Sequence, residues 1–186
     1  MKKNIIITGG LGYIGTELCK IYSGYAWNDN ITVIDNRFIS ERVNQLRSWN
    51  INFIHGDILD KDLVKKLFRD ADIVHHLAGV TQVPRVKSES NFENDEKIKK
   101  VANEGTQNIL DNISEHCKII MPSTHVVYEG ISEVKNDILE DEPTLPVLSY
   151  AISKDLNEKQ LKDSGKNYVI LRLGSVYGYS NDTMRI

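Results

Sequence analysis

A glycine-rich turn near the N-terminus has the composition of a phosphate-binding loop. Residues Thr8 to Gly15 read TGGLGYIG, which fits G-x-G-x-x-G from Gly10 and G-x-x-G-x-x-G from Gly9. The turn follows an apolar run and opens a helical pattern, so free backbone N–H groups and the positive end of the helix dipole would face an anion. Glycine also lets the backbone approach a pyrophosphate with no Cβ in between.

An acidic residue follows at the distance expected in a dinucleotide-binding unit. Asp35 ends the second apolar run, 20 residues after Gly15, where a carboxylate can accept hydrogen bonds from both hydroxyls of an adenosine ribose. The same carboxylate would repel a 2′-phosphate, so the pattern favours NAD, and Arg37 nearby leaves NADP open. Asp57, after the third apolar run, suits either an adenine amino group or the cap of the next helix. The residues alone do not decide between these two roles.

Tyr150 and Lys154 form a candidate acid/base pair. They are four residues apart near the start of a helical pattern, so they lie on one face, one turn apart. An ammonium group there favours the phenolate, and lowering a tyrosine pKa from ~10 to near 7 needs about 4 kcal/mol. The same spacing also fits a half-buried tyrosine beside a solvated lysine.

Strand and helix patterns alternate along the chain. We expect strands at Asn4–Thr8, Ile31–Asp35, Ile51–His55, Ile73–Leu77, Lys118–Met121 and Tyr168–Leu173, and helices at Tyr13–Tyr22, Ser40–Trp49, Lys61–Phe68, Phe92–Glu115 and Ser149–Lys162. Several strands are almost continuously apolar, as strands covered on both faces must be. This predicts an α/β fold with a doubly wound, Rossmann-like parallel sheet. The segment Glu129–Val147 is irregular and too long for an ordinary turn.

Composition and charge exclude several other classes. With 186 residues, 40% of them hydrophobic, the chain suits one domain with a proper core, or one domain and the start of a second. The net charge of −3 is spread along the chain, so nucleic acid and anionic membranes are not expected partners. No run reaches the length of a signal-peptide h-region or a membrane span. Cys19 and Cys117 lie in apolar patterns typical of buried thiols in a reducing compartment, and a disulfide between them is the weaker alternative. We expect a cytoplasmic protein.

Two adjacent histidines are the first candidates for metal ligands in this sequence. His75 and His76 end the fourth predicted strand, and neighbouring strand residues point to opposite faces, so they cannot chelate one ion together. The remaining acids and histidines lack metal-ligand spacing, and we expect no metal.

The motifs in their order resemble a known family. TGGLGYIG, Asp35-Asn36, GDI at Gly56–Ile58, HLAG at His76–Gly79, ST-x-x-VY at Ser123–Tyr128, Tyr150-x-x-x-Lys154 and RLGSVYG at Arg172–Gly178 occur in sequence between residues 4 and 180. This set is similar to the extended short-chain dehydrogenase/reductase family, the NAD-dependent epimerases and dehydratases of nucleotide sugars.

The resemblance implies a role for each matching residue. Along NAD these are Gly9, Gly12, Tyr13 and Ile14 at the pyrophosphate, Asp35 and Asn36 at the adenosine ribose, Asp57 and Ile58 at adenine, and Leu77, Ala78 and Gly79 under the nicotinamide half, with Thr81 just beyond. Tyr150 would be the acid/base, and Lys154 would tune it and hold the nicotinamide ribose. Thr124, three residues before Val127, would be the catalytic hydroxyl, with Ser123 as its neighbour.

Three departures from the family pattern refine the expectation. Dehydratases of the family carry Asp-Glu directly after the catalytic threonine, whereas His125 and Val126 stand here. The asparagine of the family's N-x-x-G-T pattern is replaced by Ala102, with Asn103 shifted by one position. Family members also carry a C-terminal substrate domain, so we expect an NAD-binding domain over residues 1–178 and the start of a truncated or missing substrate-binding region at 179–186.

The favoured function is therefore an NAD-dependent nucleotide-sugar epimerase, which oxidises its substrate transiently to a keto-sugar and returns the hydride. One alternative is an NAD(P)H-dependent keto-sugar or carbonyl reductase. Another is a non-catalytic dinucleotide-sensing regulator, against which the joint presence of Thr124, Tyr150 and Lys154 argues. The resemblance also implies a homodimer through the fourth and fifth predicted helices, with Leu110 and Ile152 as apolar candidates for the contact.

Overall fold

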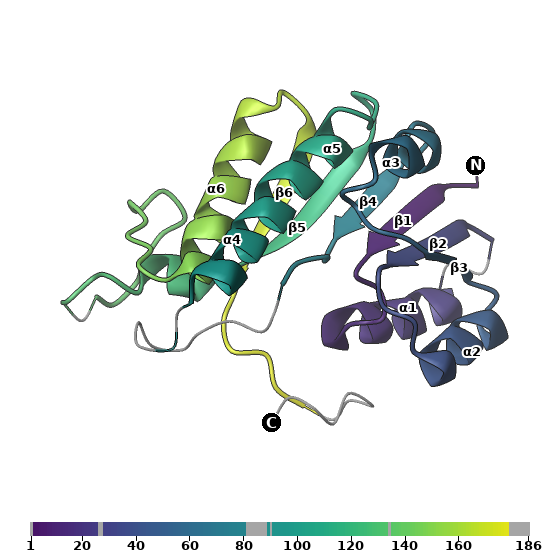
Figure 1. The fold of residues 1–186 in the computed structure, drawn as a ribbon, viewed down its shortest axis with the longest axis horizontal. Helices are drawn as coiled ribbons and strands as arrows, with labels where there is room; N and C mark the ends of the chain where they lie inside the picture. Colours follow the sequence, from purple (N-terminus) through teal and green to yellow (C-terminus); the bar gives the residue numbers. More distant parts are fainter. Residues whose placement is uncertain (1, 26–27, 81–88, 90, 134, 179–186) are drawn as a thin grey trace.

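A computed structural model describes residues 2–25, 28–80, 89, 91–133 and 135–178 (Figure 1). Six parallel strands form one sheet in the order β3-β2-β1-β4-β5-β6. The strands are β1 (Asn4–Thr8), β2 (Asn30–Asp35), β3 (Asn52–His55), β4 (Ile73–His76), β5 (Lys118–Thr124) and β6 (Asn167–Leu173). The helices are α1 (Tyr13–Tyr25), α2 (Ser40–Ser48), α3 (Lys61–Phe68), α4 (Phe92–Lys100), the π-helical η2 (Val101–Gly105), α5 (Thr106–Leu110), the 3₁₀ turn η3 (His125–Tyr128) and α6 (Ser149–Asp163). The expected doubly wound parallel sheet is confirmed.

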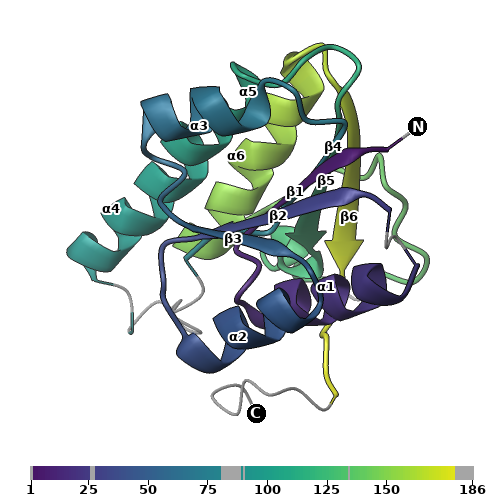
Figure 2. The ribbon, with the colours of Figure 1, turned by 90° about the vertical axis from the view of Figure 1, so that its right-hand side faces the viewer.

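Helices cover the sheet on two faces (Figure 2). On one face α1 and α2 pack over β1–β3 around Ile5, Ile7, Val33 and Leu46. On the other face α3, α5 and α6 enclose a second cluster that includes Ile6, Ile34, Phe68, Met121 and Leu161. Ile5 and Ile7 belong to one cluster and Ile6 to the other, which is the alternation that a strand buried on both faces requires.

The strand order brings functional segments together at one edge. After β3 the chain crosses back, and β4 pairs with β1 on the side away from β2, with Thr8 opposite His76. Because all strands are parallel, the segments that follow β1, β2, β4 and β5 leave the sheet at its carboxyl edge. Ligands bind at such a reversal point in open α/β sheets.

The predicted helix Phe92–Glu115 is shorter than expected and is interrupted. Its helical part ends at Leu110, and η2 separates α4 from α5. A Cβ on Gly105, the last residue of η2, would lie 2.4 Å from Cδ1 of Ile58, so glycine lets this helix pack directly on Ile58. Leu110 is only 3% exposed and belongs to the core, so its expected role in a dimer contact is wrong.

Strand β5 continues three residues past the predicted end at Met121, to Thr124. Proline in a central strand usually removes a ladder hydrogen bond, and Pro122 lies inside this continuation. However, β4 pairs with β5 only as far as Ile120. Beyond that residue β5 pairs, among the strands that the structure describes, with β6 alone, and this pairing runs to Thr124 opposite Leu173. Pro122 is therefore tolerated there.

The remaining expectations concern cysteines and the irregular segment. Cys19 and Cys117 are free and buried, and burial raises their pKa values to about 12 and about 11.

In the described part of residues 129–147 no helix or strand occurs. The two ends of this segment are nevertheless bonded to each other, because the Glu129 carboxylate accepts the N–H groups of Val147 and Leu148 at 2.8 and 2.5 Å. No helix among the described residues is long and apolar enough to cross a bilayer. Residues 179–186 lie outside the described chain.

Candidate active site

A cleft of about 250 Å³ opens at the carboxyl edge of the sheet. It brings together most of the residues that the sequence predicted, namely Gly9, Gly12, Tyr13, Ile14, Leu77, Gly79, Thr124, Tyr150 and Lys154. The end of β6 at Leu173 and the following Gly174 and Val176 complete its wall. These residues belong to the RLGSVYG motif, to which the sequence analysis assigned no role. Thr81 lies outside the described residues.

The glycine turn fits the phosphates of a dinucleotide. Gly9 has a φ of +67°, and a Cβ there would lie 2.8 Å from Cα of Ala78. Only glycine therefore lets the turn after β1 touch the turn after β4. A Cβ on Gly15 would lie 2.6 Å from Cα of Gly10, so helix α1 also approaches the turn closely. Since the first-turn N–H groups of a helix have no intrahelical acceptor, the turn and the start of α1 form a backbone cradle for an anion.

Asp35 lies at the end of β2, where its carboxylate is covered by Arg37. Its Oδ2 accepts the N–H of Leu11 at 3.0 Å, and its Oδ1 accepts the N–H of Arg37 at 3.0 Å. The Arg37 guanidinium adds contacts of 3.2 Å from Nε and 3.3 Å from a terminal nitrogen. The Asp35 side chain is 3% exposed and that of Arg37 is 49% exposed. A ribose that reaches Asp35 must therefore meet Arg37 as well.

Asp57 forms a hydrogen bond with Asn36 and does not cap helix α3. Its Oδ2 accepts Nδ2 of Asn36 at 3.0 Å, and its Oδ1 accepts the N–H of Leu59 at 2.9 Å. The cap of α3 is Asp60, which accepts the N–H of Leu63. The capping alternative for Asp57 is therefore wrong. The sheet brings Asn36 and Asp57 together at the ends of β2 and β3.

Ile58 follows Asp57 and is buried in the core beside Gly105. Its carbonyl accepts Nδ2 of Asn108 at 3.0 Å. The backbone of Ile58 is therefore held by α5 and its side chain packs against η2, and a contact of Ile58 with adenine stays a prediction. Ala78 likewise lies behind the cleft, against Gly9.

Helix α6 and strand β5 supply the candidate acid/base residues. Lys154 donates from Nζ to the carbonyl of Pro122 at 2.9 Å, and the same Nζ lies 6.0 Å from the centre of the Tyr150 ring. Burial lowers the pKa of Lys154 to about 8, although the nearby Glu158 raises it. Thr124 ends β5, and its Oγ1 accepts the N–H of Val126 at 3.3 Å. With a pKa of about 8, the Lys154 ammonium is still protonated at neutral pH but loses its proton more readily than an ordinary lysine.

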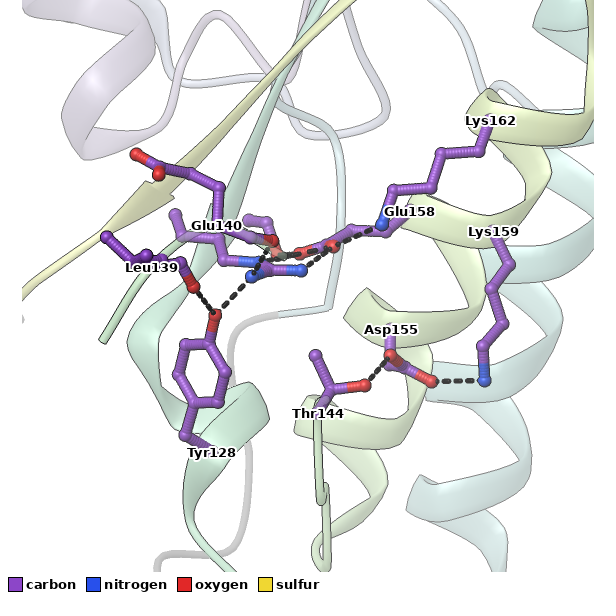
Figure 3. A network of polar contacts seen from close by, with 10 residues as sticks. Tyr128, Leu139, Glu140, Thr144, Asp155, Glu158, Lys159 and Lys162 are labelled. Carbon is purple, nitrogen blue, oxygen red and sulfur yellow. Dashed lines mark hydrogen bonds and ion pairs between the residues drawn. The ribbon is translucent and has the colours of Figure 1, made fainter. Parts of the chain in front are cut away.

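A buried carboxylate that the sequence did not predict lies one helical turn beyond Lys154. Glu158 is 1% exposed. It accepts the Ser123 hydroxyl at 2.6 Å and two nitrogens of Arg172, the shorter contact being 2.7 Å. Figure 3 shows it on α6 beside Tyr128 and the segment around Glu140. The spacing of four residues after Lys154 was the one signal that could have identified it.

The two histidines turn to opposite sides of the sheet, as expected. Nε2 of His75 lies 2.6 Å from the Tyr22 hydroxyl. His76 lies between Thr8 and Thr106, with Nδ1 3.0 Å from one hydroxyl and Nε2 2.9 Å from the other. Burial, together with the charge of Lys154, lowers the pKa of His76 to about 3. Among the described residues, no three His, Cys, Asp or Glu side chains are grouped as metal ligands.

Comparison with known proteins gives consistent matches. The model of the NAD dependent epimerase/dehydratase family matches residues 5–186. A UDP-glucose 4-epimerase of Azospirillum brasilense is 30% identical over 187 residues, which are 94% of this chain and 49% of that protein. A dTDP-glucose 4,6-dehydratase of Streptomyces niveus is 30% identical over 190 residues, covering 94% of this chain and 54% of that protein.

A solved structure adds the same likeness in three dimensions. The crystal structure of UDP-glucuronic acid 4-epimerase from Bacillus cereus in complex with NAD has a TM-score of 0.77 and 26% identity to this chain. The match covers 94% of this chain and 57% of that one. The chain spans about half the length of the curated relatives that it matches.

The lowered pKa of Lys154 predicts a pH-dependent stability difference. The folded pKa is about 8 and that of an unfolded lysine is about 10.4, so the unfolded chain binds more protons between these pH values and folding stability rises with pH there. Compared with Lys154→Met, the wild type should gain about 3 kcal/mol of unfolding free energy from pH 7 to pH 10.5. Urea unfolding of both proteins measures this gain.

The control is Lys159→Met on the same helix, because the pKa of the exposed Lys159 is raised by its contact with Asp155. A folded pKa above the unfolded value gives stability that is lost as pH rises through it. The wild type should therefore gain nothing over this control. Equal pH dependence in the two comparisons would contradict a lowered Lys154 pKa.

Proposed function

Because the chain belongs to the NAD-dependent epimerase/dehydratase family, we propose that it carries the cofactor-binding part, residues 1–178, of an NAD-dependent nucleotide-sugar epimerase. The observation that carries the proposal is one cleft lined by the glycine turn, Thr124, Tyr150 and Lys154. UDP-sugar 4-epimerases among the relatives and solved structures support it. His125 and Val126, where family dehydratases have Asp-Glu, favour epimerisation over 4,6-dehydration.

The proposed cofactor is NAD. Gly9, Gly12 and the start of α1 would hold its pyrophosphate, and Asp35 with Asn36 would hold the adenosine ribose. When bound, NAD supplies a nicotinamide that takes up hydride from the sugar carbon and returns it to the other face of the keto-sugar.

The residues of the chain supply the proton chemistry. The carbon that bears a sugar hydroxyl gives up hydride readily only when the hydroxyl proton leaves, so Tyr150 as phenolate would take that proton. The Lys154 ammonium favours the phenolate form because it is an adjacent positive charge. Thr124 would hydrogen-bond the same sugar oxygen and fix its distance from Tyr150. Tyr150 then returns the proton when the keto-sugar is reduced, so no net redox change remains.

A reductase that uses NADPH is the second candidate. The observation in its favour is the Arg37 guanidinium on Asp35, since an arginine near that acid accommodates a 2′-phosphate in NADP enzymes. The regulator alternative has no comparable support, because Thr124, Tyr150 and Lys154 all line the cleft.

Replacing the proposed base tests the chemistry. In the full-length protein, Tyr150→Phe should lower kcat for nucleotide-sugar epimerisation by about 10²–10⁴-fold, because no side chain then takes the hydroxyl proton. Cofactor binding should persist. Tyr25→Phe, at the exposed end of α1, is the matched control and should leave kcat unchanged. Near-wild-type turnover of Tyr150→Phe would contradict the proposed mechanism. Accumulation of free NADH or NADP during turnover would indicate the reductase.

Cofactor selectivity follows from Asp35 and Arg37. We expect NAD to bind at least about ten times more tightly than NADP, since repulsion of one phosphate by a carboxylate costs ~1–3 kcal/mol. Arg37→Ala should widen the ratio further, because the carboxylate then faces the 2′-position without its counter-charge. Calorimetric titration of both cofactors into both proteins measures the two ratios. Equal affinities in the wild type would defeat the argument from Asp35.

The full-length protein is proposed to be a cytoplasmic homodimer, with α4 and α6 at the contact. In support, the two helices pack side by side, and Ile152 on α6 is 42% exposed. Light scattering at micromolar concentration should give a dimer, and Ile152→Glu should shift it to a monomer. The control Ile21→Glu, at an exposed isoleucine of α1, should stay dimeric. A monomeric wild type would exclude the dimer.

A further inference from the structure

Two strands and one helix converge on the carboxylate of Glu158. Ser123 of β5 and Arg172 of β6 are partners in the strand register, so their side chains leave the sheet side by side on one face. Both bond the same acceptor. The Ser123 hydroxyl donates to Oε1 at 2.6 Å, and Arg172 donates from Nε to Oε1 at 3.0 Å and from a terminal nitrogen to Oε2 at 2.7 Å. The Arg172 side chain is itself only 14% exposed.

These contacts are adjacent to the proposed acid/base residues on both elements. On β5, Ser123 directly precedes Thr124. On α6, Glu158 comes four residues after Lys154 and eight after Tyr150, so the three lie along one face. Lys154 donates to the carbonyl of Pro122, the residue before Ser123. Successive turns of α6 are thus bonded to successive residues of β5, which fixes both the spacing and the register of the helix against the strand.

Arg172 extends the attachment to the chain segment that leads into α6. It donates to the carbonyl of Glu140 at 2.9 Å and to the hydroxyl of Tyr128. That hydroxyl in turn donates to the carbonyl of Leu139 at 3.3 Å, a contact drawn as a dashed line in Figure 3. A charged group with this many partners cannot shift without leaving several of them unpaired.

We propose that Glu158 is the positioning residue of this site: with Ser123 and Arg172 it holds α6 against the end of β5, so that Tyr150 and Thr124 meet one substrate oxygen. The inference rests on the proposed function and deepens it. Glu158 does not touch the substrate. It acts through Ser123 on one side and through its own helix on the other.

Its negative charge also acts on Lys154. Around that ammonium, α6 contributes Tyr150 and the anionic Glu158, β4 contributes the neutral His76, and β5 contributes the Pro122 carbonyl. Around Glu158 itself stand two cations, Arg172 and Lys162. Removing the carboxylate charge would leave these cations unbalanced near Lys154, and the ammonium would lose its proton at lower pH.

The neighbouring carboxylate of α6 provides a matched control. Asp155 is also buried, and it pairs with Lys159 at 2.7 Å and accepts the Thr144 hydroxyl at 2.6 Å. Figure 3 shows this pair on the side of the helix next to Thr144. Asp155→Asn removes the same charge from the same helix but leaves Ser123 and Arg172 untouched.

The experiment compares Glu158→Gln, Glu158→Asp and Asp155→Asn in the full-length protein. For Glu158→Gln we expect kcat to fall at least about tenfold with KM and NAD affinity within about twofold, because positioning acts on the reacting oxygen and not on the glycine turn. Glu158→Asp keeps the charge but shortens the reach, so it should recover the Lys154 pKa but not the full kcat. Asp155→Asn should leave both unchanged.

A readout independent of turnover is the pKa of Lys154, followed by NMR in protein with ¹³Cε-labelled lysine and assigned with Lys154→Met. It should fall by about one unit in Glu158→Gln and stay in place in Asp155→Asn. If Glu158→Gln only lowers the melting temperature, with kcat and the Lys154 pKa unchanged, the proposal is overturned. If the wild type epimerises no nucleotide sugar, the proposed function fails, while the NMR comparison still decides whether Glu158 controls Lys154.

Discussion

Thr8 Oγ1 accepts the N–H of Ala78 at 3.0 Å and shares a second 3.0 Å hydrogen bond with Nδ1 of His76. Nε2 of the same imidazole lies 2.9 Å from the Thr106 hydroxyl, so the ring bridges the two threonines. Thr106 also accepts Nδ2 of Asn157 at 3.0 Å. One buried chain of hydrogen bonds therefore runs from β1 through β4 and α5 to α6, and the arrangement of the cleft depends on it.

This series of hydrogen bonds explains how helix α6, which buries several polar side chains, is held in a fixed position. Ser153, Asp155, Asn157 and Glu158 are among the buried residues of α6, so apolar packing alone does not set its position. Asn157 bonds the α5 side, and Glu158 bonds β5 and β6. Hydrogen bonds are directional, and each buried group that lost its partner would cost about 1–3 kcal/mol. They therefore specify the rotation and register of the helix that carries Tyr150, which hydrophobic contacts would leave adjustable.

The sequence predicted the fold and the cleft where local pattern decides the structure. Apolar runs, the glycine turn and the Tyr150–Lys154 spacing each have a short-range signature, and all of them lie where expected. The features that the sequence did not predict correctly depend on contacts between residues far apart in the chain. Pro122 stays in β5 because β4 has already ended, and Leu110 is buried because α5 turns it into the core. Glu158 reads as one more charge on a helix until the β5–β6 register sets Ser123 beside Arg172.

The two arginine–carboxylate pairs of the site differ in exposure, and the difference suits their positions. Arg37 is 49% exposed, so water can solvate its guanidinium when it leaves Asp35, and the carboxylate keeps the backbone N–H groups of Leu11 and Arg37 as donors. Arg172 is 14% exposed and faces a carboxylate with 1% exposure, and breaking such a pair strands a buried charge at a cost of roughly 3–5 kcal/mol. The end proposed to admit a ribose is therefore the adaptable one. The end proposed to hold the Tyr150 and Thr124 oxygens at fixed distances from a substrate oxygen is the rigid one.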